Sequence, residues 1–382
     1  MNAQTVPNPD TSNVVAISGT LPKTPANSTK PKSKLVALDI GNSTTKCAMP
    51  KVGKPAKLAS IPTAVLEVPN PEEYACTFEY KGTHYTVGTE ALESGKAEKM
   101  VYSLASLAEA RKVEDFGLYF RAVLAKLTNP KKLGQVQRFK FALSTSAGRG
   151  LHPVLKKEAE KVTSLKVNGE KFEYEIEVVG VFPEGFGVGA SQETKAFTER
   201  GIRFDRALLL DFGQGTLIVS RYDSRENLNA TASSSAEDNL VSRFALGQGC
   251  IQIGEDWVEW ATPHYKNVTP NQDTLFNALL KPYPTGDGYY FDTSKALDRK
   301  LNEVLVKVIE KRWETLKRNP QLAKALRGAE HRGLKVYACG GGAMLMRSVL
   351  EAEGIEIVPN PGFANAIGMA NWLQANASKG GK

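Results

Sequence analysis

The chain contains 382 residues, of which 41% are hydrophobic and 24% are charged, so it is long enough for a substantial core and about two or three domains. The net charge of +8 permits contact with nucleic acid or an anionic membrane, but Lys and Arg form no dense run, which favours a diffuse surface charge. The spacing of the four cysteines and four histidines indicates neither a zinc site nor a disulfide framework. Neither a signal peptide nor an apolar run of about 18 residues is found, so we expect a cytoplasmic protein that is not transmembrane.

The first 33 residues differ in composition from the rest of the chain. Residues 1–33 contain five prolines, many Ser, Thr and Asn, and no aromatic residue. Such a segment buries too little apolar surface to offset its ordering entropy, so we predict a disordered N-terminal tail. It can serve as a plain linker or, through the lysines near its end, as an arm that touches a membrane, DNA or a neighbouring subunit.

From residue 34 onward, apolar runs alternate with segments of helical periodicity. In the first half we predict a strand over 34–40, a returning strand over 44–50, a hairpin over 79–88, a helix over 104–127, a strand over 138–148 that runs into a loop, a helix over 152–164 and a strand over 172–183. Next we predict a helix over 183–197 that begins near Pro183, a strand–turn–strand over 207–223, a polar loop over 224–239, a helix over 251–261 and an irregular segment over 262–273. The last predicted elements are a helix over 297–318, a strand-to-helix turn over 334–345, a short strand over 355–361 and a helix over 362–375. The alternation indicates an α/β fold with mixed sheets.

One short pattern occurs twice, each time at the end of an apolar strand. The copies are Asp39-Ile40-Gly41-Asn42-Ser43-Thr44 and Asp211-Phe212-Gly213-Gln214-Gly215-Thr216. They start 172 residues apart, about half the length of the folded part. Solenoid repeats have periods of about 20–50 residues, so this spacing indicates two duplicated halves instead.

The residue types in this pattern suit a polyphosphate ligand. Glycine in the turn permits positive φ and close approach of the backbone to a ligand, and successive N–H groups form a nest for phosphate oxygens. Lys46 adds a positive charge. The carboxylates of Asp39 and Asp211 would repel phosphate unless a cation such as Mg²⁺ lies between them. The alternative interpretation of each copy is an ordinary hairpin turn, but the repetition argues for two loops that grip one polyphosphate.

A third element is the glycine triplet Gly340, Gly341 and Gly342, between a strand and a helix. Three glycines let a flat base or ribose lie against the backbone, with a helix N-terminus nearby for phosphate. The alternative is a tight strand-to-helix turn. The sequence contains neither GxGxxG nor GxxxxGK[ST], so neither a Rossmann fold nor a P-loop is predicted.

In this order the three elements resemble the actin superfamily, in which they correspond to two phosphate loops and an adenosine loop. The resemblance covers residues 34–375. It implies an α/β fold with two related actin-like (ribonuclease-H-like) domains flanking a nucleotide cleft, and Mg²⁺ with ATP or GTP as the ligand. We expect domain I over 34–182, completed by the C-terminal helix 362–375, domain II over 183–361, and a flexible C-terminal tail over 376–382.

The segment Val181-Phe182-Pro183-Glu184-Gly185, followed by Gly187 and Gly189, narrows this resemblance. It is similar to ParM/StbA-type bacterial actins, the filament proteins that segregate plasmids, in which a Glu at this position orients the attacking water. The resemblance implies Glu184 and Asp211 as catalytic residues and Asp39 and Asp211 as metal-binding residues. It implies as nucleotide-binding residues Asp39, Gly41, Asn42, Ser43, Thr44, Lys46, Gly213, Gln214, Gly215, Thr216, Gly340, Gly341 and Gly342.

Two details qualify these assignments. Gln214 and Gly215 stand where ParM-type loops often carry Gly and Thr. The alternative role for Glu184 is an acid in the first turn of a helix, favoured by the helix dipole.

The C-terminal segment from Asn360 to Asn371 is similar to the second interdomain connection of the family.

The function implied by the resemblance is a filament-forming ATPase or GTPase. Its partners would be further copies of itself and a small adaptor protein, either DNA-binding or membrane-linked. Its task would be plasmid or DNA segregation, or a cell-shape cytoskeleton at the cell cortex. Direct sequence-specific DNA binding is not expected, because the positive charge is diffuse. The alternative is a non-polymerising relative, either chaperone-like or a small-molecule kinase.

Overall fold

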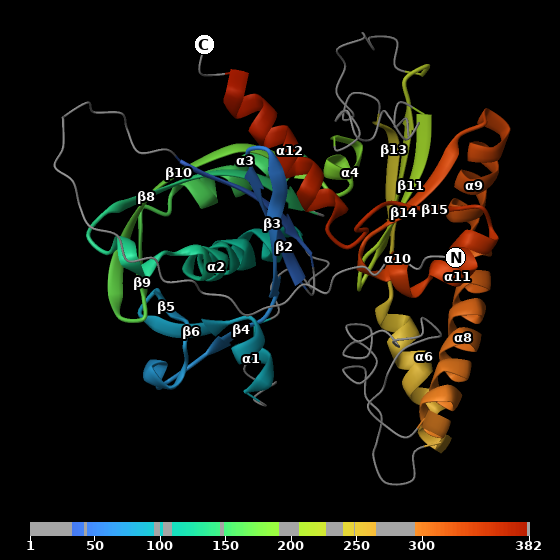
Figure 1. Cartoon of the computed structure of the whole chain (residues 1–382), viewed down its shortest axis with the longest axis horizontal. Coiled ribbons are helices and arrows are strands. Elements are labelled where there is room, and N and C mark those ends of the chain that lie inside the picture. The colour runs from blue at the N-terminus through green and yellow to red at the C-terminus, as the bar shows by residue number, and fades with distance from the viewer. Residues whose placement is uncertain are drawn as a thin grey trace. The chain divides into compact units, whose positions relative to one another are not determined.

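Two buried apolar runs form the central strands of two separate sheets in the computed structural model (Figure 1). The first is β1 (Lys34–Ile40) and the second is β11 (Arg206–Phe212). The structure describes residues 33–41, 44–94, 100–101, 109–145, 149–190, 206–226, 240–247, 249–264 and 295–379.

The sheet around β1 has ten strands. The other nine are β2 (Thr44–Lys51), β3 (Lys54–Pro62), β4 (Val65–Glu67), β5 (Thr77–Tyr80), β6 (Thr83–Val87), β7 (Met100–Val101), β8 (Val136–Thr145), β9 (Ser164–Val167) and β10 (Glu170–Pro183). Their spatial order is β3-β2-β1-β8-β10-β9-β5-β6-β4-β7. β1 pairs antiparallel with β2 and parallel with β8, and β8 pairs parallel with β10.

The sheet around β11 has five strands in the order β13-β12-β11-β14-β15. The others are β12 (Leu217–Asp223), β13 (Leu240–Leu246), β14 (Lys335–Cys339) and β15 (Glu356–Ile357). β13, β12 and β11 pair antiparallel, whereas β11, β14 and β15 pair parallel. The first sheet has the same arrangement in its strands β3-β2-β1-β8-β10, with an antiparallel three-strand meander followed by two parallel strands. The duplication that the paired motifs predict is therefore visible in the topology.

Ten α-helices accompany these sheets in the described residues. They are α1 (Thr89–Glu93), α2 (Glu109–Leu127), α3 (His152–Glu160), α4 (Phe186–Ala190), α6 (Ile251–Ala261), α8 (Lys295–Lys317), α9 (Pro320–Arg332), α10 (Gly341–Leu345), α11 (Arg347–Ala352) and α12 (Ala364–Lys379). α2 and α3 bury their apolar stripes in the core of the first sheet, and α6, α8 and α9 do so in the core of the second. No helix in these described ranges has the length and apolarity that a bilayer crossing requires.

α4 and α12 connect the two sheets. Phe186 of α4 packs with Ala366, Met369 and other apolar residues of α12 against small side chains of β1, β2 and β8. Val188 of α4 and Ala364 of α12 pack instead in an apolar cluster with residues of β11 and β14. The chain passes from the first sheet to the second through β10 and α4, and it returns through the segment before α12. Both passages therefore lie beside the ends of β1 and β11.

Most of the predicted strands and helices are confirmed, with some corrections. The hairpin over 79–88 turns at Lys81 and Gly82, which have positive φ angles of 53° and 80°. The helix predicted over 152–164 ends earlier, at Glu160, and the chain has already entered the strand β9 at Ser164. The predicted strand over 355–361 has only the two residues of β15. The unpredicted strands and α-helices are β3, β4, β7, β9, β13, α1, α9 and α11. The predicted tail over 1–33, except its last residue, lies outside the described residues.

The helix expected to begin near Pro183 begins three residues later, which corrects the alternative role of Glu184. Pro183 is the last residue of β10 and pairs with Thr145, and Gly185 then turns the chain with a φ of +87°. α4 starts only at Phe186 and has no acidic residue in its first turn. Glu184 therefore lies in the turn before the helix, where its backbone N–H donates to the carbonyl oxygen of Thr145 at 3.3 Å.

Candidate functional site

The two copies of the repeated motif have closely matching turn geometry. Asp39 pairs across its hairpin with Lys46, and Asp211 pairs across its hairpin with Ile218. A Cβ on Gly41 would lie 2.9 Å from the carbonyl oxygen of Thr44, and a Cβ on Gly213 would lie 3.1 Å from that of Thr216. Because both contacts are tighter than usual, glycine is favoured at the same point of each turn. The Gly213 N–H donates to the Thr216 carbonyl oxygen at 2.9 Å.

Both turns open onto one cavity. Nine of the predicted site residues line it: Asp39, Gly41, Lys46, Glu184, Asp211, Gly213, Gln214, Thr216 and Gly340. They come from both sheets and from the passage between β10 and α4. Ile218, Cys339, Pro361, Gly362 and Asn365 also line the cavity and were not predicted as site residues.

Six further predicted residues are not among those that line the cavity in the described part of the chain. Thr44, Gly215, Gly341 and Gly342 are described but are not among the lining residues. Asn42 and Ser43 lie outside the described residues.

The glycine triplet combines two packing positions with one open position. Gly340 has a φ of +84°, and a Cβ there would lie 2.4 Å from Oδ1 of Asp211. A Cβ on Gly342 would lie 1.9 Å from Sγ of Cys250, whereas a Cβ on Gly341 would meet nothing within 4 Å. Gly340 and Gly342 thus let β14 and α10 pack tightly against the end of β11 and the start of α6. The turn interpretation and the ligand interpretation of this loop are therefore compatible.

Three carboxyl groups line the cavity, Asp39, Glu184 and Asp211, and burial and crowding raise the pKa values of the last two. Burial raises the pKa of Glu184 to about 8, assisted by the charges of Asp211 and Asp39 and opposed by those of Arg243 and Lys46. Burial and the charge of Asp39 raise the pKa of Asp211 to about 6, with Lys46 opposing them. The site is therefore short of positive charge.

This shortage fits a divalent cation, which would reduce the repulsion among Asp39, Asp211 and Glu184. In the stretches of chain that the structure covers, no group of three or more His, Cys, Asp or Glu side chains is placed to enclose a metal ion. Mg²⁺ commonly takes only one or two carboxylates and fills its other positions with water and phosphate oxygens. The carboxylates present match that mode of binding.

Asn365, at the start of α12, fixes the first aspartate. Its Nδ2 donates to Oδ1 of Asp39 and to Oγ of Ser144, both at 2.8 Å, and its Oδ1 accepts from the Gly187 N–H at 2.7 Å. The residue is 4% exposed. It therefore joins β1, β8, α4 and α12 at the edge of the cavity. The only sequence signal for Asn365 is its place in the return segment from Asn360 to Asn371, which by itself gives this asparagine no role.

Comparisons with known proteins identify the fold. No family model and no curated protein matches the sequence. The ADP complex of Ta0583, an archaeal actin homologue, matches with a TM-score of 0.60 and 19% identity, over 90% of this chain and 99% of that chain. Bacillus thuringiensis ParM with ATP matches with a TM-score of 0.59 and 12% identity, over 91% and 99% of the two chains. A 15-stranded ParM filament from Clostridium botulinum matches with a TM-score of 0.59 and 15% identity, over 90% of this chain and 99% of that chain. The chain therefore has an actin-like α/β fold, in which two related ribonuclease-H-like domains flank a cleft.

Proposed function

We propose that this protein binds and hydrolyses ATP or GTP with Mg²⁺ and assembles into filaments. The observation that carries the proposal is that both copies of the repeated turn, Lys46 and Glu184 line the same cavity. The solved structures with ADP and with ATP are nucleotide complexes of proteins with this fold, and they support the choice of ligand.

Each part of the cavity has a role in this proposal. The backbone N–H groups of the two turns and the ammonium group of Lys46 bind the phosphates. Asp39 and Asp211 would hold the metal ion, and the loop that begins at Gly340 would contact the nucleoside. Mg²⁺, when bound, would neutralise part of the phosphate charge. Asn365 keeps the Asp39 carboxylate in place through its hydrogen bond.

Glu184 is the proposed catalytic carboxylate. It lies in a turn rather than within a helix, and it lines the cavity between the two sheets. From this position its carboxylate would orient a water molecule toward the terminal phosphate and accept its proton. Phosphoryl transfer depends mostly on positioning and charge stabilisation, so these groups would be sufficient.

Substitution of Glu184 tests the hydrolytic role. Glu184→Ala should leave the nucleotide dissociation constant within about twofold and slow phosphate release by about 10²- to 10⁴-fold, the usual contribution of a general base. Glu177→Ala is a matched control, because Glu177 belongs to β10, the strand that leads to Glu184, and pairs with Lys140 on the surface. An unchanged rate of phosphate release in Glu184→Ala would contradict the proposed role of Glu184 as the catalytic carboxylate.

Self-assembly is the second part of the proposal. It is supported by the ParM filament of the same fold, and a small adaptor protein is the expected further partner, with plasmid DNA or the cell cortex as the destination. Light scattering and electron microscopy should show polymers with ATP or GTP and Mg²⁺ and none without nucleotide. Nucleotide hydrolysis without assembly under any of these conditions would favour the non-polymerising alternative, a chaperone-like protein or a small-molecule kinase.

A further inference from the structure

Arg243 is a cation beside the candidate site that belongs to no sequence motif. It lies on β13, directly opposite Ser220 of β12. Alternate residues of a strand share a face, so Ser220 lies on the same face of β12 as Ile218, which pairs with Asp211 and lines the cavity. The pleat therefore places Arg243 on the cavity-facing side of the five-stranded sheet.

The guanidinium of Arg243 is directed to Glu184. Its Nη2 lies 4.0 Å from Oε2 of Glu184, and the two side chains are 22% and 14% exposed. The Nε of Arg243 is buried and has no hydrogen-bond partner among the described residues. Glu184 directly follows β10 of the ten-stranded sheet, whereas Arg243 belongs to β13 of the five-stranded sheet. This ion pair therefore spans the two halves of the site.

We propose that Arg243 is a positioning residue that orients the Glu184 carboxylate for its action on water. The inference rests on the proposed hydrolytic function and adds a residue that acts through Glu184 rather than through the nucleotide. An ion pair in a largely buried place restricts the carboxylate to few orientations. Loss of the cation would leave that carboxylate without its charged partner and free to turn away.

The test compares nucleotide binding with single-turnover ATP hydrolysis in four variants. The variants are Arg243→Ala, Arg243→Lys, Glu184→Gln and the double variant Arg243→Ala/Glu184→Gln. Arg243→Ala should slow the single-turnover rate about 10- to 100-fold, the range that follows from a small misplacement of a catalytic group. The dissociation constants for ATP and ADP should stay within about twofold, because Arg243 does not act through the phosphates.

The Lys variant and the double variant separate positioning from a general structural effect. Arg243→Lys should recover part of the rate, since it keeps the charge but not the planar fork of arginine. The double variant should be no slower than Glu184→Gln alone, because two residues that act as a unit are not additive. A lost structural support would instead slow the Glu184→Gln protein further.

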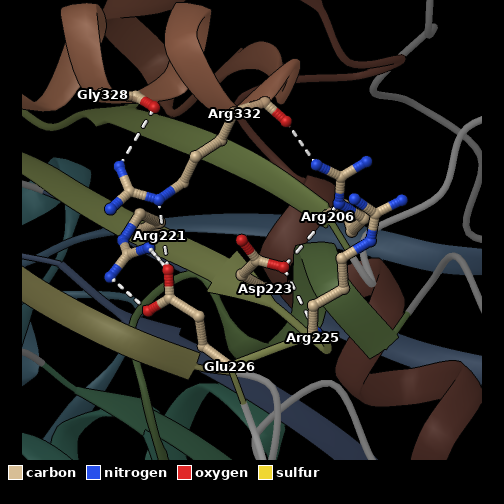
Figure 2. Close-up of polar contacts among 7 residues, drawn as sticks. All are labelled: Arg206, Arg221, Asp223, Arg225, Glu226, Gly328 and Arg332. Carbon is tan, nitrogen blue, oxygen red and sulfur yellow. Dashed lines mark hydrogen bonds and ion pairs between the residues drawn. The ribbon is translucent and has the colours of Figure 1, made fainter.

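Arg221→Ala is the matched control. Arg221 lies on the neighbouring strand β12, and its side chain is 17% exposed. Figure 2 shows that its guanidinium pairs with Glu226, through hydrogen bonds of 2.6 and 2.9 Å. This variant removes the same charge from the same sheet without touching Glu184, and its hydrolysis rate should equal that of the unchanged protein.

Several results would overturn the inference. One is a normal rate in Arg243→Ala while Glu184→Gln is slow. Another is a loss in the double variant equal to the product of the two single losses. A third is ATP affinity weakened tenfold or more with ADP affinity unchanged, which would mean direct contact with the terminal phosphate. Absence of hydrolysis in the unchanged protein would instead contradict the proposed function itself. If Arg243→Ala does not fold, Arg243→Lys and its combination with Glu184→Gln carry the test.

Discussion

Glu184 shows how a single residue can link the chemistry of a site to the stability of the protein. Its folded-state pKa of about 8 exceeds the ordinary value of 4.5, and that of Asp211 is about 6 compared with 3.8. In both cases the folded protein keeps a proton that the unfolded chain releases. Stability is therefore greatest below the ordinary values and falls as the pH rises through the folded-state values.

Because both pKa values are raised by folding, we predict that the nucleotide- and metal-free protein loses stability as the pH rises from about 4.5 to about 8. The total loss should be on the order of 7 kcal/mol, since the raised pKa values of Glu184 and Asp211 together span about 5 pH units in this window and each such unit corresponds to about 1.4 kcal/mol. Urea unfolding with a metal chelator at several pH values measures it. In Glu184→Gln the slope should be smaller over the same window.

A surface carboxyl group provides the control for this pH dependence. Hydrogen bonds from Arg221 lower the pKa of Glu226, so its titration lies below the window in which Glu184 titrates. Glu226→Gln should leave the slope between pH 4.5 and pH 8 as it is in the unchanged protein. An equal slope in the unchanged protein and in Glu184→Gln would contradict the raised pKa of Glu184.

At the scale of elements, the loop between β14 and α10 provides a paired test. Gly342→Ala should destabilise the protein by about 1–3 kcal/mol or more, because its Cβ would lie 1.9 Å from Sγ of Cys250 and overpack that contact. Gly341→Ala, one residue earlier, should change stability by less than about 0.5 kcal/mol, since nothing lies within 4 Å of the added atom. Urea unfolding of both variants measures the difference, and similar stabilities would show that the loop tolerates side chains at both positions.

The same scale shows what the sequence could and could not predict. β1 and β11 were predictable because each contains three or four consecutive buried apolar residues and is followed by a glycine turn. β13 was missed because its residues alternate irregularly between exposed and half-buried, as suits an edge strand whose partner is chosen by tertiary pairing. For this reason Arg243 could not be placed beside Glu184 from sequence.

α9 is a different kind of omission, because its signals were present. Asn319 caps the helix by accepting from the N–H groups of Gln321 and Leu322, Pro320 follows at the first position, and Gly333 ends it with a φ of 59°.

Most of the proposed nucleotide loops could be located in the sequence because they repeat. Asn365 could not be assigned a role, because its three partners lie 178, 221 and 326 residues away.

For the whole molecule, loops from both sheets share one cavity, so a ligand there should stabilise both sheets together. Nucleotide at 100 times its dissociation constant should raise the free energy of unfolding by about 2.7 kcal/mol. Hydrogen exchange should then slow in peptides from both the β1–β2 turn and the β11–β12 turn. A nucleoside without phosphates is the control, and it should protect the two turns far less. Protection confined to one turn would contradict a shared phosphate site.

The two matching hairpins differ in one respect that gives the cavity a direction. Lys46 and Ile218 occupy equivalent positions opposite Asp39 and Asp211, and both line the cavity. One hairpin thus presents an ammonium group where the other presents a hydrocarbon side chain. A polyphosphate chain that bound in reverse would move its most highly charged end away from the ammonium group and toward the isoleucine. A single divergence between two duplicated halves would thus select one orientation of an asymmetric ligand on a nearly symmetric framework.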